Sequence, residues 1–304
     1  MTTKPLRFGL VGTGYWAQVT HAPALAATDG VEFAAIWGRD PRAAADLAGA
    51  YQAAPHHDVS AFLAGIDAVS FAVPPDVQAA IATRAAREGK HLLLEKPVAL
   101  TEAAADGLVE AVEQAAVASV VFFIQRFQPD VRAWLAEVEA RGGWAGGVSA
   151  WLGSALRESN PFNTRWRRDK GGLWDVGPHM VSLLWASLGP VTSVTADAGL
   201  ADVTHLVLHH QGGATSTTTV TLGAAEAASG FEAYVWGESG RLAAPLGSVD
   251  RVTALSTALA ELAATARAGR TRHPCDAWFG RDVGRVLAEA QRQIDARRAG
   301  HADA

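Results

Sequence analysis

The sequence predicts a two-domain α/β protein, with a doubly wound parallel sheet in residues 1–125 and an α+β domain with an open, mostly antiparallel sheet in residues 126–304. In the first domain, short apolar segments without a polar face alternate with longer Ala-rich amphipathic segments. That pattern is typical of a parallel sheet covered by helices on both sides. After residue 145, strand-like segments follow one another through glycine-containing turns, which favours antiparallel pairing. The 304 residues suffice for two domains of roughly 100–200 residues each.

Strands and helices are predicted to alternate through the first domain. Pro41 suits the first turn of a helix, where its missing N–H would be unsatisfied anyway. Thr101 is a typical N-cap for the helix that it opens. The predicted strands are Leu6–Val11, Glu32–Trp37, Asp67–Val73, His91–Leu94 and Ser119–Ile124. The predicted helices are Tyr15–Ala27, Pro41–Tyr51, Asp76–Glu88 and Thr101–Ala116.

The second domain is predicted from a series of strands and two closing helices. These helices are Arg251–Ala268 and Ala277–Arg298, and the latter could pack back on the first domain. The predicted strands are Gly147–Leu152, Val191–Ala196, Val203–His210, Ala214–Leu222, Phe231–Trp236 and Arg241–Ala244.

Composition argues against several classes of protein. A net charge of -5 and a pI near 6.1 disfavour a nucleic-acid partner, which usually requires a basic face. No run of about 18 apolar residues is present, so no membrane span is predicted. The N-terminal residues lack the apolar core of a signal peptide, so we expect a cytoplasmic protein. The single cysteine, Cys275, and the spacing of the histidines predict no metal site.

A Gly-x-Gly-x-x-Ala turn follows the first predicted strand directly and opens the first predicted helix. Gly12 permits the tight turn, Gly14 lets a pyrophosphate approach the backbone, and Ala17 keeps the helix close to the sheet. The helix N-terminus then offers free N–H groups to the phosphates. This context predicts a Rossmann domain that binds a nicotinamide dinucleotide. The predicted cofactor-binding residues of the turn are Gly12, Thr13, Gly14, Tyr15 and Trp16.

The loop after the second strand bears on the choice of cofactor. An acid at this place usually binds the ribose hydroxyls of NAD, whereas an arginine accommodates the 2′-phosphate of NADP. Gly38 and Arg39 stand where the acid would be, with Asp40 just beyond. We therefore expect NADP, with NAD as the alternative. Arg39 as a solvated loop residue is the competing interpretation.

Two further loops leave the carboxyl ends of predicted strands, where ligands bind in a doubly wound sheet. Pro74 and Pro75 would stiffen one wall of the crevice, although they could simply start a helix. Val73 and Pro74 are predicted to contact the cofactor, as are Glu95 and Lys96. Glu95 and Lys96 follow the fourth predicted strand. A lysine there can hydrogen-bond a nicotinamide ribose or a substrate hydroxyl. Taken alone, Lys96 would more readily be read as a surface residue.

Residues 171–179 read Gly-Gly-Leu-Trp-Asp-Val-Gly-Pro-His. Asp175 and His179 are four apart, so on a helix they would share one face. A carboxylate beside an imidazole is a common way to build a general acid or base. The two glycines indicate a close approach of another backbone. The competing interpretation is an N-cap aspartate and a core histidine.

Together these segments resemble the Gfo/Idh/MocA oxidoreductases, the family of glucose–fructose oxidoreductase and inositol dehydrogenase. The resemblance is carried by residues 12–17, Glu95-Lys96-Pro97, Arg126-Phe127-Gln128-Pro129 and residues 171–179. It implies an N-terminal Rossmann domain, a C-terminal domain with a large open sheet, and dimers or tetramers formed through that sheet. Two departures are Ser182, where the family often has Asp, and Val77-Gln78, where a nearby His is common.

The resemblance also implies roles for individual residues. Lys96 would lie beside nicotinamide and substrate, and Asp175 and His179 would contact the reacting hydroxyl of a sugar, polyol or related small polar substrate. His179 would act as acid or base, and Lys96 would stabilise the developing oxyanion. Arg126 and Trp166 are further candidates for substrate binding. The alternatives are a non-catalytic dinucleotide-binding sensor and a redox-assisted glycosidase or lyase with tightly bound NAD.

Overall fold

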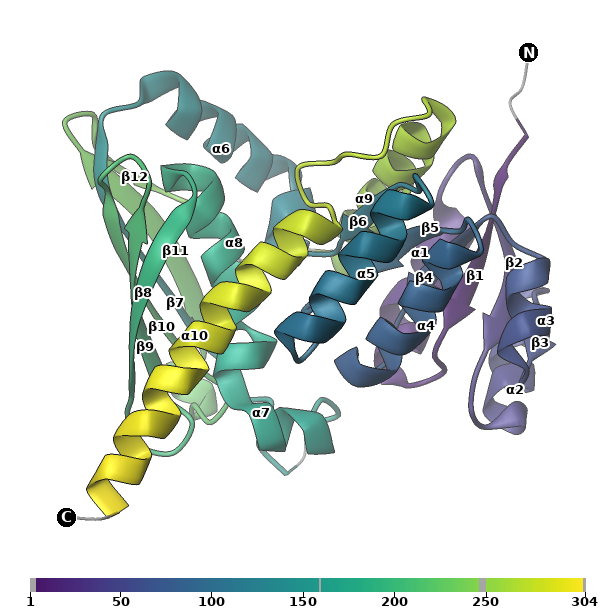
Figure 1. Ribbon diagram of the computed structural model, residues 1–304, viewed down its shortest axis with the longest axis horizontal. Helices are drawn as coiled ribbons and strands as arrows, with labels where there is room; N and C mark the ends of the chain where they lie inside the picture. The colour runs from purple at the N-terminus through teal and green to yellow at the C-terminus, as the bar shows by residue number, and fades with distance from the viewer. Residues whose placement is uncertain (1–3, 159, 246–249, 303–304) are drawn as a thin grey trace. The chain divides into compact units, whose positions relative to one another are not determined.

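The computed structural model describes residues 4–158, 160–245 and 250–302 (Figure 1). The chain forms two compact units. The first consists of the residues up to Phe127 together with Asp250–Asp282, and the second consists of the remaining residues. The predicted boundary after residue 125 lies close to the first crossing of the chain between them. Asp250–Asp282 also belongs to the first unit, whereas the sequence places this segment in the second domain.

The sheet of the first unit has six strands in the order β3-β2-β1-β4-β5-β6, and all of its pairs are parallel. This is the doubly wound order that the sequence predicts. The short edge strand β3 was not predicted, because Pro55 interrupts its three residues and no apolar run marks it. The strands are β1 (Leu6–Val11), β2 (Val31–Trp37), β3 (Ala54–His56), β4 (Ala68–Phe71), β5 (His91–Leu94) and β6 (Ser119–Val121).

Helices connect the strands of the first unit and begin where the sequence provides caps. Asp40 accepts hydrogen bonds from the N–H groups of Arg42 and Ala43, and Thr101 accepts one from Ala104 N–H. The first helix contains an unpredicted π-helical turn, η1 (Ala17–His21). The other helices are α1 (Ala22–Ala27), α2 (Pro41–Tyr51), α3 (Val59–Ala64), α4 (Pro75–Arg87), α5 (Glu102–Gln114) and the 3₁₀ helix η2 (Ile124–Phe127).

Two helices follow residue 250. Helix α9 (Arg251–Arg267) contacts α1, η1 and η2 of the first unit and buries an apolar stripe that includes Leu255, Leu259 and Leu262. That stripe explains why the segment belongs to the first unit, since it covers apolar residues of the Rossmann domain. Helix α10 (Ala277–Ala302) closes the described chain.

The sheet of the second unit is mostly antiparallel, as predicted, and includes one parallel pair, between β7 and β10. Its order is β12-β11-β7-β10-β9-β8. Figure 1 shows helices of this unit, such as α8, along one side of the sheet. The strands are β7 (Trp144–Leu152), β8 (Val191–Ala198), β9 (Thr204–His210), β10 (Thr215–Thr221), β11 (Gly230–Gly237) and β12 (Gly240–Ala243).

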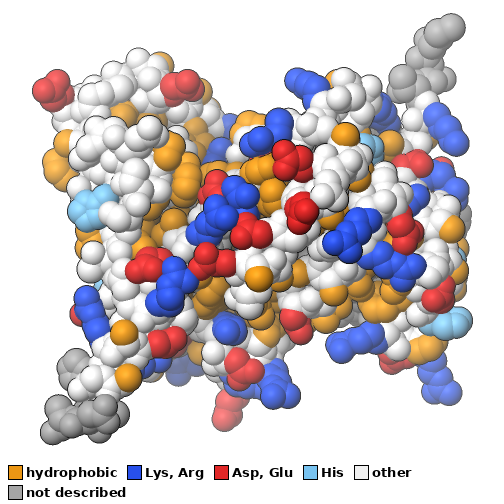
Figure 2. Space-filling view, in the orientation of Figure 1, with side chains coloured by type: hydrophobic (Ala, Val, Ile, Leu, Met, Phe, Trp, Pro, Cys, Tyr) orange, Lys and Arg blue, Asp and Glu red, His pale blue; other side chains and the backbone are white. Residues whose placement is uncertain are grey.

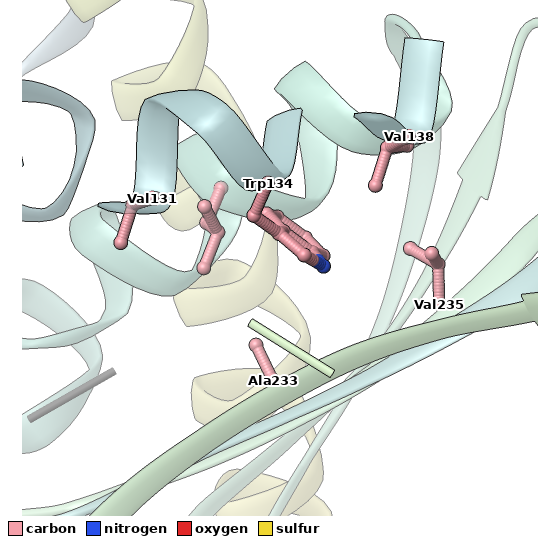
Figure 3. Packing of buried hydrophobic residues seen from close by; sticks show 6 residues of the cluster. Val131, Trp134, Val138, Ala233 and Val235 are labelled. Carbon is pink, nitrogen blue, oxygen red and sulfur yellow. The ribbon is translucent and has the colours of Figure 1, made fainter. Parts of the chain in front are cut away.

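Helix α6 (Pro129–Arg141) was not predicted, although it anchors the core of the second unit. Val131, Trp134 and Val138 project from it toward Ala233 and Val235 of β11 (Figure 3). These apolar positions recur at intervals of three and four residues, after a proline suited to a helical first turn. The spacing was therefore a usable signal for this helix.

The surface carries charges of both signs. On the face drawn in Figure 2, the basic and acidic side chains of the described residues are interspersed over the helices. Among the described helices, none is long and apolar enough to cross a membrane. No group of three or more potential metal-binding side chains occurs among the residues that the structure describes.

Candidate active site

The turn after β1 has the geometry that its glycines require. Gly12 has a φ of +126°, and a Cβ at this position would lie 2.4 Å from the carbonyl oxygen of Ala72 and 3.2 Å from Cγ1 of Val73. Gly14 is different, because a Cβ there would meet nothing within 4 Å. Gly12 is thus required by the fold, whereas Gly14 leaves its backbone accessible. Such a cradle fits the pyrophosphate of a dinucleotide.

The segment after the turn is helical from Tyr15 to Ala27 and includes the π-helical turn η1. Gln18 fastens its side chain back onto the turn by donating from Nε2 to the carbonyl oxygen of Thr13 at 2.9 Å. Tyr15 is 42% exposed, so its ring is accessible at the start of the helix. In a doubly wound fold, the N-terminus of the helix at this position is where an anion binds.

In the loop after β2, Arg39 and Asp40 differ in what they do. Asp40 Oδ1 accepts from Arg42 N–H at 2.9 Å and caps α2, so its carboxylate already has a structural task. Arg39 is exposed. Gly38 packs closely, because a Cβ there would lie 2.7 Å from Cγ2 of Thr13. The loop therefore lies against the glycine turn, and both charged residues are exposed, but only Asp40 is engaged as a helix cap.

Glu95 and Lys96 follow β5, and Glu95 is the centre of a buried polar network. Its Oε1 accepts from Trp16 Nε1 at 2.6 Å and lies 3.2 Å from His21 Nε2. The other ring nitrogen of His21 lies 2.8 Å from Ser70 Oγ. His21 and Ser70 are fully buried, and neither was predicted. Glu95 thus links the helix of the glycine turn to the strand end that carries Lys96.

Pro74 precedes the first residue of α4, in agreement with a helix start at the end of β4. Arg126 lies in η2, where its guanidinium carbon is 5.6 Å from the centre of the Phe279 ring. The peptide bond between Lys96 and Pro97 is cis.

The predicted site residues are divided between the two units. All the predicted cofactor-binding residues, Lys96 among them, belong to the first unit. Trp166, Asp175 and His179 belong to the second.

The glycines at 171 and 172 have different roles in the second unit. Gly171 interrupts α7 (Arg165–Asp175) with a φ of +65°. A Cβ on Gly172 would lie 2.7 Å from Cα of Thr221, at the end of β10. This contact leaves room for hydrogen only, so the segment that leads to Asp175 is held against the sheet.

Asp175 and His179 lie on two successive helices, which corrects the prediction of one continuous helix face. Asp175 ends α7, Val176 separates the helices, and His179 lies in the first turn of α8 (Gly177–Leu188). Pro178 and Gly177 disfavour an uninterrupted helix, which explains the break. Both Asp175 and His179 are 5% exposed.

An aromatic ring lies against the imidazole of His179. The imidazole stacks on Trp151 of β7, with ring centres 5.3 Å apart and planes inclined by 27°. Trp151 in turn stacks on Phe231 of β11 at 4.8 Å. The backbone carbonyl of His179 accepts from Ser182 Oγ at 2.8 Å, so the residue that departs from the family pattern bonds within the helix. The stacking restricts the plane of the imidazole.

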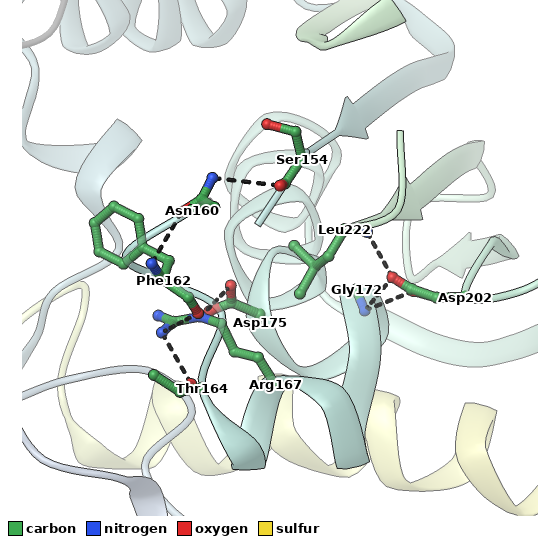
Figure 4. A network of polar contacts seen from close by, with 9 residues as sticks. All are labelled: Ser154, Asn160, Phe162, Thr164, Arg167, Gly172, Asp175, Asp202 and Leu222. Carbon is green, nitrogen blue, oxygen red and sulfur yellow. Dashed lines mark hydrogen bonds and ion pairs between the residues drawn. The ribbon is translucent and has the colours of Figure 1, made fainter. Parts of the chain in front are cut away.

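Asp175 forms an ion pair that the sequence did not predict (Figure 4). Arg167 Nε lies 2.8 Å from Asp175 Oδ2, and both side chains are largely buried. The guanidinium also donates from Nη1 to Thr164 Oγ1 at 3.4 Å and lies 4.8 Å from the ring centre of Trp166. Arg167 therefore fixes the carboxylate, and Trp166 lies against that pair. An arginine two helical turns before Asp175 was the only signal in the sequence.

Asp202 ties the glycine pair to the sheet (Figure 4). Its carboxylate accepts from Gly172 N–H at 3.3 Å and from the N–H of Leu222. Burial raises the pKa of Asp202 above its usual value, although these hydrogen bonds act in the opposite direction. The negative charge of nearby Asp175 raises the pKa further. Asp202 was not predicted, because its partners lie far from it in sequence.

Two family models match the chain. The model of the GFO/IDH/MocA oxidoreductase family with an NAD-binding Rossmann fold matches residues 6–123. The model of the GFO/IDH/MocA C-terminal domain matches residues 135–243. One matched range lies in the first unit and the other in the second.

Individual proteins are similar as well. An uncharacterized oxidoreductase of Synechocystis sp. is 32% identical over 213 residues, which cover 66% of this chain and 56% of that protein. Inositol 2-dehydrogenase of Rhizobium meliloti is 34% identical over 125 residues, which cover 41% of this chain and 38% of that protein. The matched segments thus span just over half the length of the first relative and less than two fifths of the second.

The fold agrees with that of solved structures. The crystal structure of GenD2 from gentamicin A biosynthesis, in complex with NAD, superposes with a TM-score of 0.83 at 21% identity. The superposition covers 97% of this chain and 95% of that one, so both domain folds are shared.

Proposed function

The chain belongs to the GFO/IDH/MocA oxidoreductase family, and from this premise we propose that it is an NAD(P)-dependent dehydrogenase or reductase acting on a CH–OH group. The proposed substrate is a sugar, a polyol or a related small polar molecule, as the name of the inositol 2-dehydrogenase relative suggests. The observation that carries the proposal is the geometry of the glycine cradle, the turn of residues 12–14. Gly12 has no room for a side chain, whereas the space beside Gly14 is empty to 4 Å. We also propose a cytoplasmic location.

The proposed catalytic residues are Lys96, Asp175 and His179. A bound nicotinamide supplies the hydride acceptor or donor. His179 takes the proton from the substrate hydroxyl during oxidation and returns it during reduction. Lys96 stabilises the oxyanion that develops on that oxygen, which is worth about 3–4 kcal/mol for one good donor. Asp175, held by Arg167, orients the imidazole or a second hydroxyl.

A panel of sugars, polyols and keto-sugars, each with cofactor present, tests this function by thermal shift. A ligand of the native state raises the melting temperature by mass action. We expect at least one compound to do so and also to be turned over. Binding without any redox change in the cofactor would favour the sensor. Bond cleavage without net cofactor reduction would favour the glycosidase or lyase.

We predict that NADP binds more tightly than NAD, because the exposed Arg39 can clamp a 2′-phosphate while Asp40 caps α2. A charged hydrogen bond is worth about 1.5–3 kcal/mol, so Arg39→Ala should weaken NADP binding by about 10- to 100-fold and leave NAD binding unchanged. Isothermal titration measures both affinities. Arg42→Ala, which removes an exposed charge nearby, is the control. If wild-type protein binds NAD at least as tightly as NADP, Arg39 is not the residue that selects between the two cofactors.

We also propose a homodimer or homotetramer formed through the open face of the second sheet. On β10, Ser216, Thr218 and Val220 are buried, and Val220 packs with Met180 of α8, whereas the alternate residues Thr215 and Thr217 are exposed. An uncovered face with strand-forming residues is suited to packing against a second sheet. Light scattering at micromolar concentration should give a multiple of the 31.8 kDa chain mass. A monomer mass would exclude this assembly.

A further inference from the structure

Gln78 lies in the first turn of α4, and its side chain is fully buried. Its Oε1 accepts from Glu95 N–H at 2.7 Å, and its Nε2 donates to the carbonyl oxygen of Glu95 at 2.8 Å. The same Nε2 lies 3.2 Å from the carbonyl oxygen of Pro97 and 3.3 Å from that of Val98. These partners are all backbone groups of residues 95–98, the segment that includes Lys96.

These contacts require a primary amide of this length. One end must accept a hydrogen bond and the other must donate, which only asparagine and glutamine do without titrating. The two hydrogens of Nε2 are within hydrogen-bond reach of three carbonyl oxygens, of which that of Glu95 is the nearest. Methionine would fill a similar volume without these bonds, and a carboxylate would place an acceptor against three carbonyls.

We infer that Gln78 is a positioning residue for Lys96, because it clamps the backbone on both sides of that lysine. This inference rests on the proposed function, in which Lys96 stabilises charge on the reacting oxygen. The ammonium of lysine stands at the end of a flexible four-carbon stem. The position of the ammonium group therefore depends on a fixed backbone at Lys96. A displacement of a catalytic group by about 1 Å can lower the rate of catalysis about 10²-fold.

The first test is a double-mutant cycle between Q78M and K96A, measured well below the melting temperature of each variant. Q78M should lower kcat by about 10- to 100-fold in the wild-type background. In the K96A background it should lower kcat no more than about threefold, because the group that it positions is already absent. Equal losses in both backgrounds would indicate a general structural role and overturn the inference. Thr83→Val removes a hydrogen bond to Ala79 in the same helix and should leave kcat unchanged.

Q78E provides a second readout that does not depend on residual activity in K96A. Burial favours the neutral form of the introduced carboxyl, which carries an O–H and can donate to Glu95 as the amide does. The ratio of Q78E to wild-type kcat should therefore rise as pH falls, whereas the ratio for Q78M should stay flat. Ratios that are flat for both variants, or wild-type kcat in Q78M, would contradict the inference.

Hydrogen exchange at the Glu95 amide separates this inference from the proposed function. Gln78 Oε1 accepts a hydrogen bond from the Glu95 N–H. The Glu95 amide should therefore exchange at least about tenfold faster in Q78M than in wild-type protein. Its exchange rate in Thr83→Val should equal that of wild-type protein. If no sugar or polyol is turned over by wild-type protein, the proposed function fails, yet the exchange rate still reports on the clamp. Unchanged exchange in Q78M would overturn the clamp, whatever the activity.

Discussion

His179→Ala is expected to lower kcat by about 10²- to 10⁴-fold, the usual contribution of a general acid or base, while cofactor affinity stays nearly unchanged. The imidazole is buried against Trp151 in the second unit, whereas the glycine cradle lies wholly in the first. Loss of the ring should therefore remove proton transfer without altering the residues proposed to hold the pyrophosphate. Steady-state kinetics and isothermal titration of the cofactor measure the two quantities separately.

His57→Ala is the control for this variant, because it removes an exposed histidine that has no proposed role in the reaction. It should leave kcat at saturating cofactor unchanged. A His179→Ala enzyme that keeps more than about a tenth of wild-type kcat would remove the acid–base role. A variant that also loses cofactor affinity would indicate damage to the fold, and its melting temperature would show this.

Gly14→Ala is expected to weaken cofactor binding by about 10- to 100-fold without lowering the melting temperature of the free protein. A methyl group at this position meets nothing within 4 Å, so the fold accommodates it. The methyl would instead occupy the space proposed for the pyrophosphate, and such overpacking costs about 1–3 kcal/mol.

Gly12→Ala is the matched variant, and it should lower both the melting temperature and the cofactor affinity. Its methyl group would lie 2.4 Å from the carbonyl oxygen of Ala72, and the φ of +126° disfavours any side chain. Calorimetry and cofactor titration of both variants distinguish the two glycines. Unchanged cofactor affinity in Gly14→Ala would show that the pyrophosphate does not approach this backbone.

The fold could be predicted because hydrophobic periodicity and turn residues are local signals. The uniform apolar segment Leu6–Val11 marked a buried parallel strand, and its bounds are confirmed. The sequence assigned α9 to the wrong unit, because its apolar stripe indicates that it packs but not against what. Helix α6 has apolar residues at helical spacing and was predictable, whereas β3 is a three-residue strand with no comparable signal.

The candidate site was predictable where a residue type reflects its own backbone. Gly12 is an example, since its positive φ requires glycine. The residues that support the site were not predictable in this way. Arg167, Gln78 and His21 acquire their significance only from partners that tertiary structure supplies, at sequence separations of 8 to 74 residues. A buried glutamine also gives no sign in sequence of the backbone groups that it binds.

The most direct test of the central claim is to follow reduced nicotinamide while oxidised NADP or NAD and the panel of sugars and polyols are mixed with stoichiometric protein. Stoichiometric protein reveals even a single turnover. The account predicts that at least one compound reduces the cofactor, and that His179→Ala and Lys96→Ala abolish or strongly slow this reduction. Lys96→Ala should also weaken cofactor binding, because its side chain is proposed to lie beside the nicotinamide. Tight cofactor binding with no reduction by any compound, or equal reduction by wild type and both variants, would contradict the account.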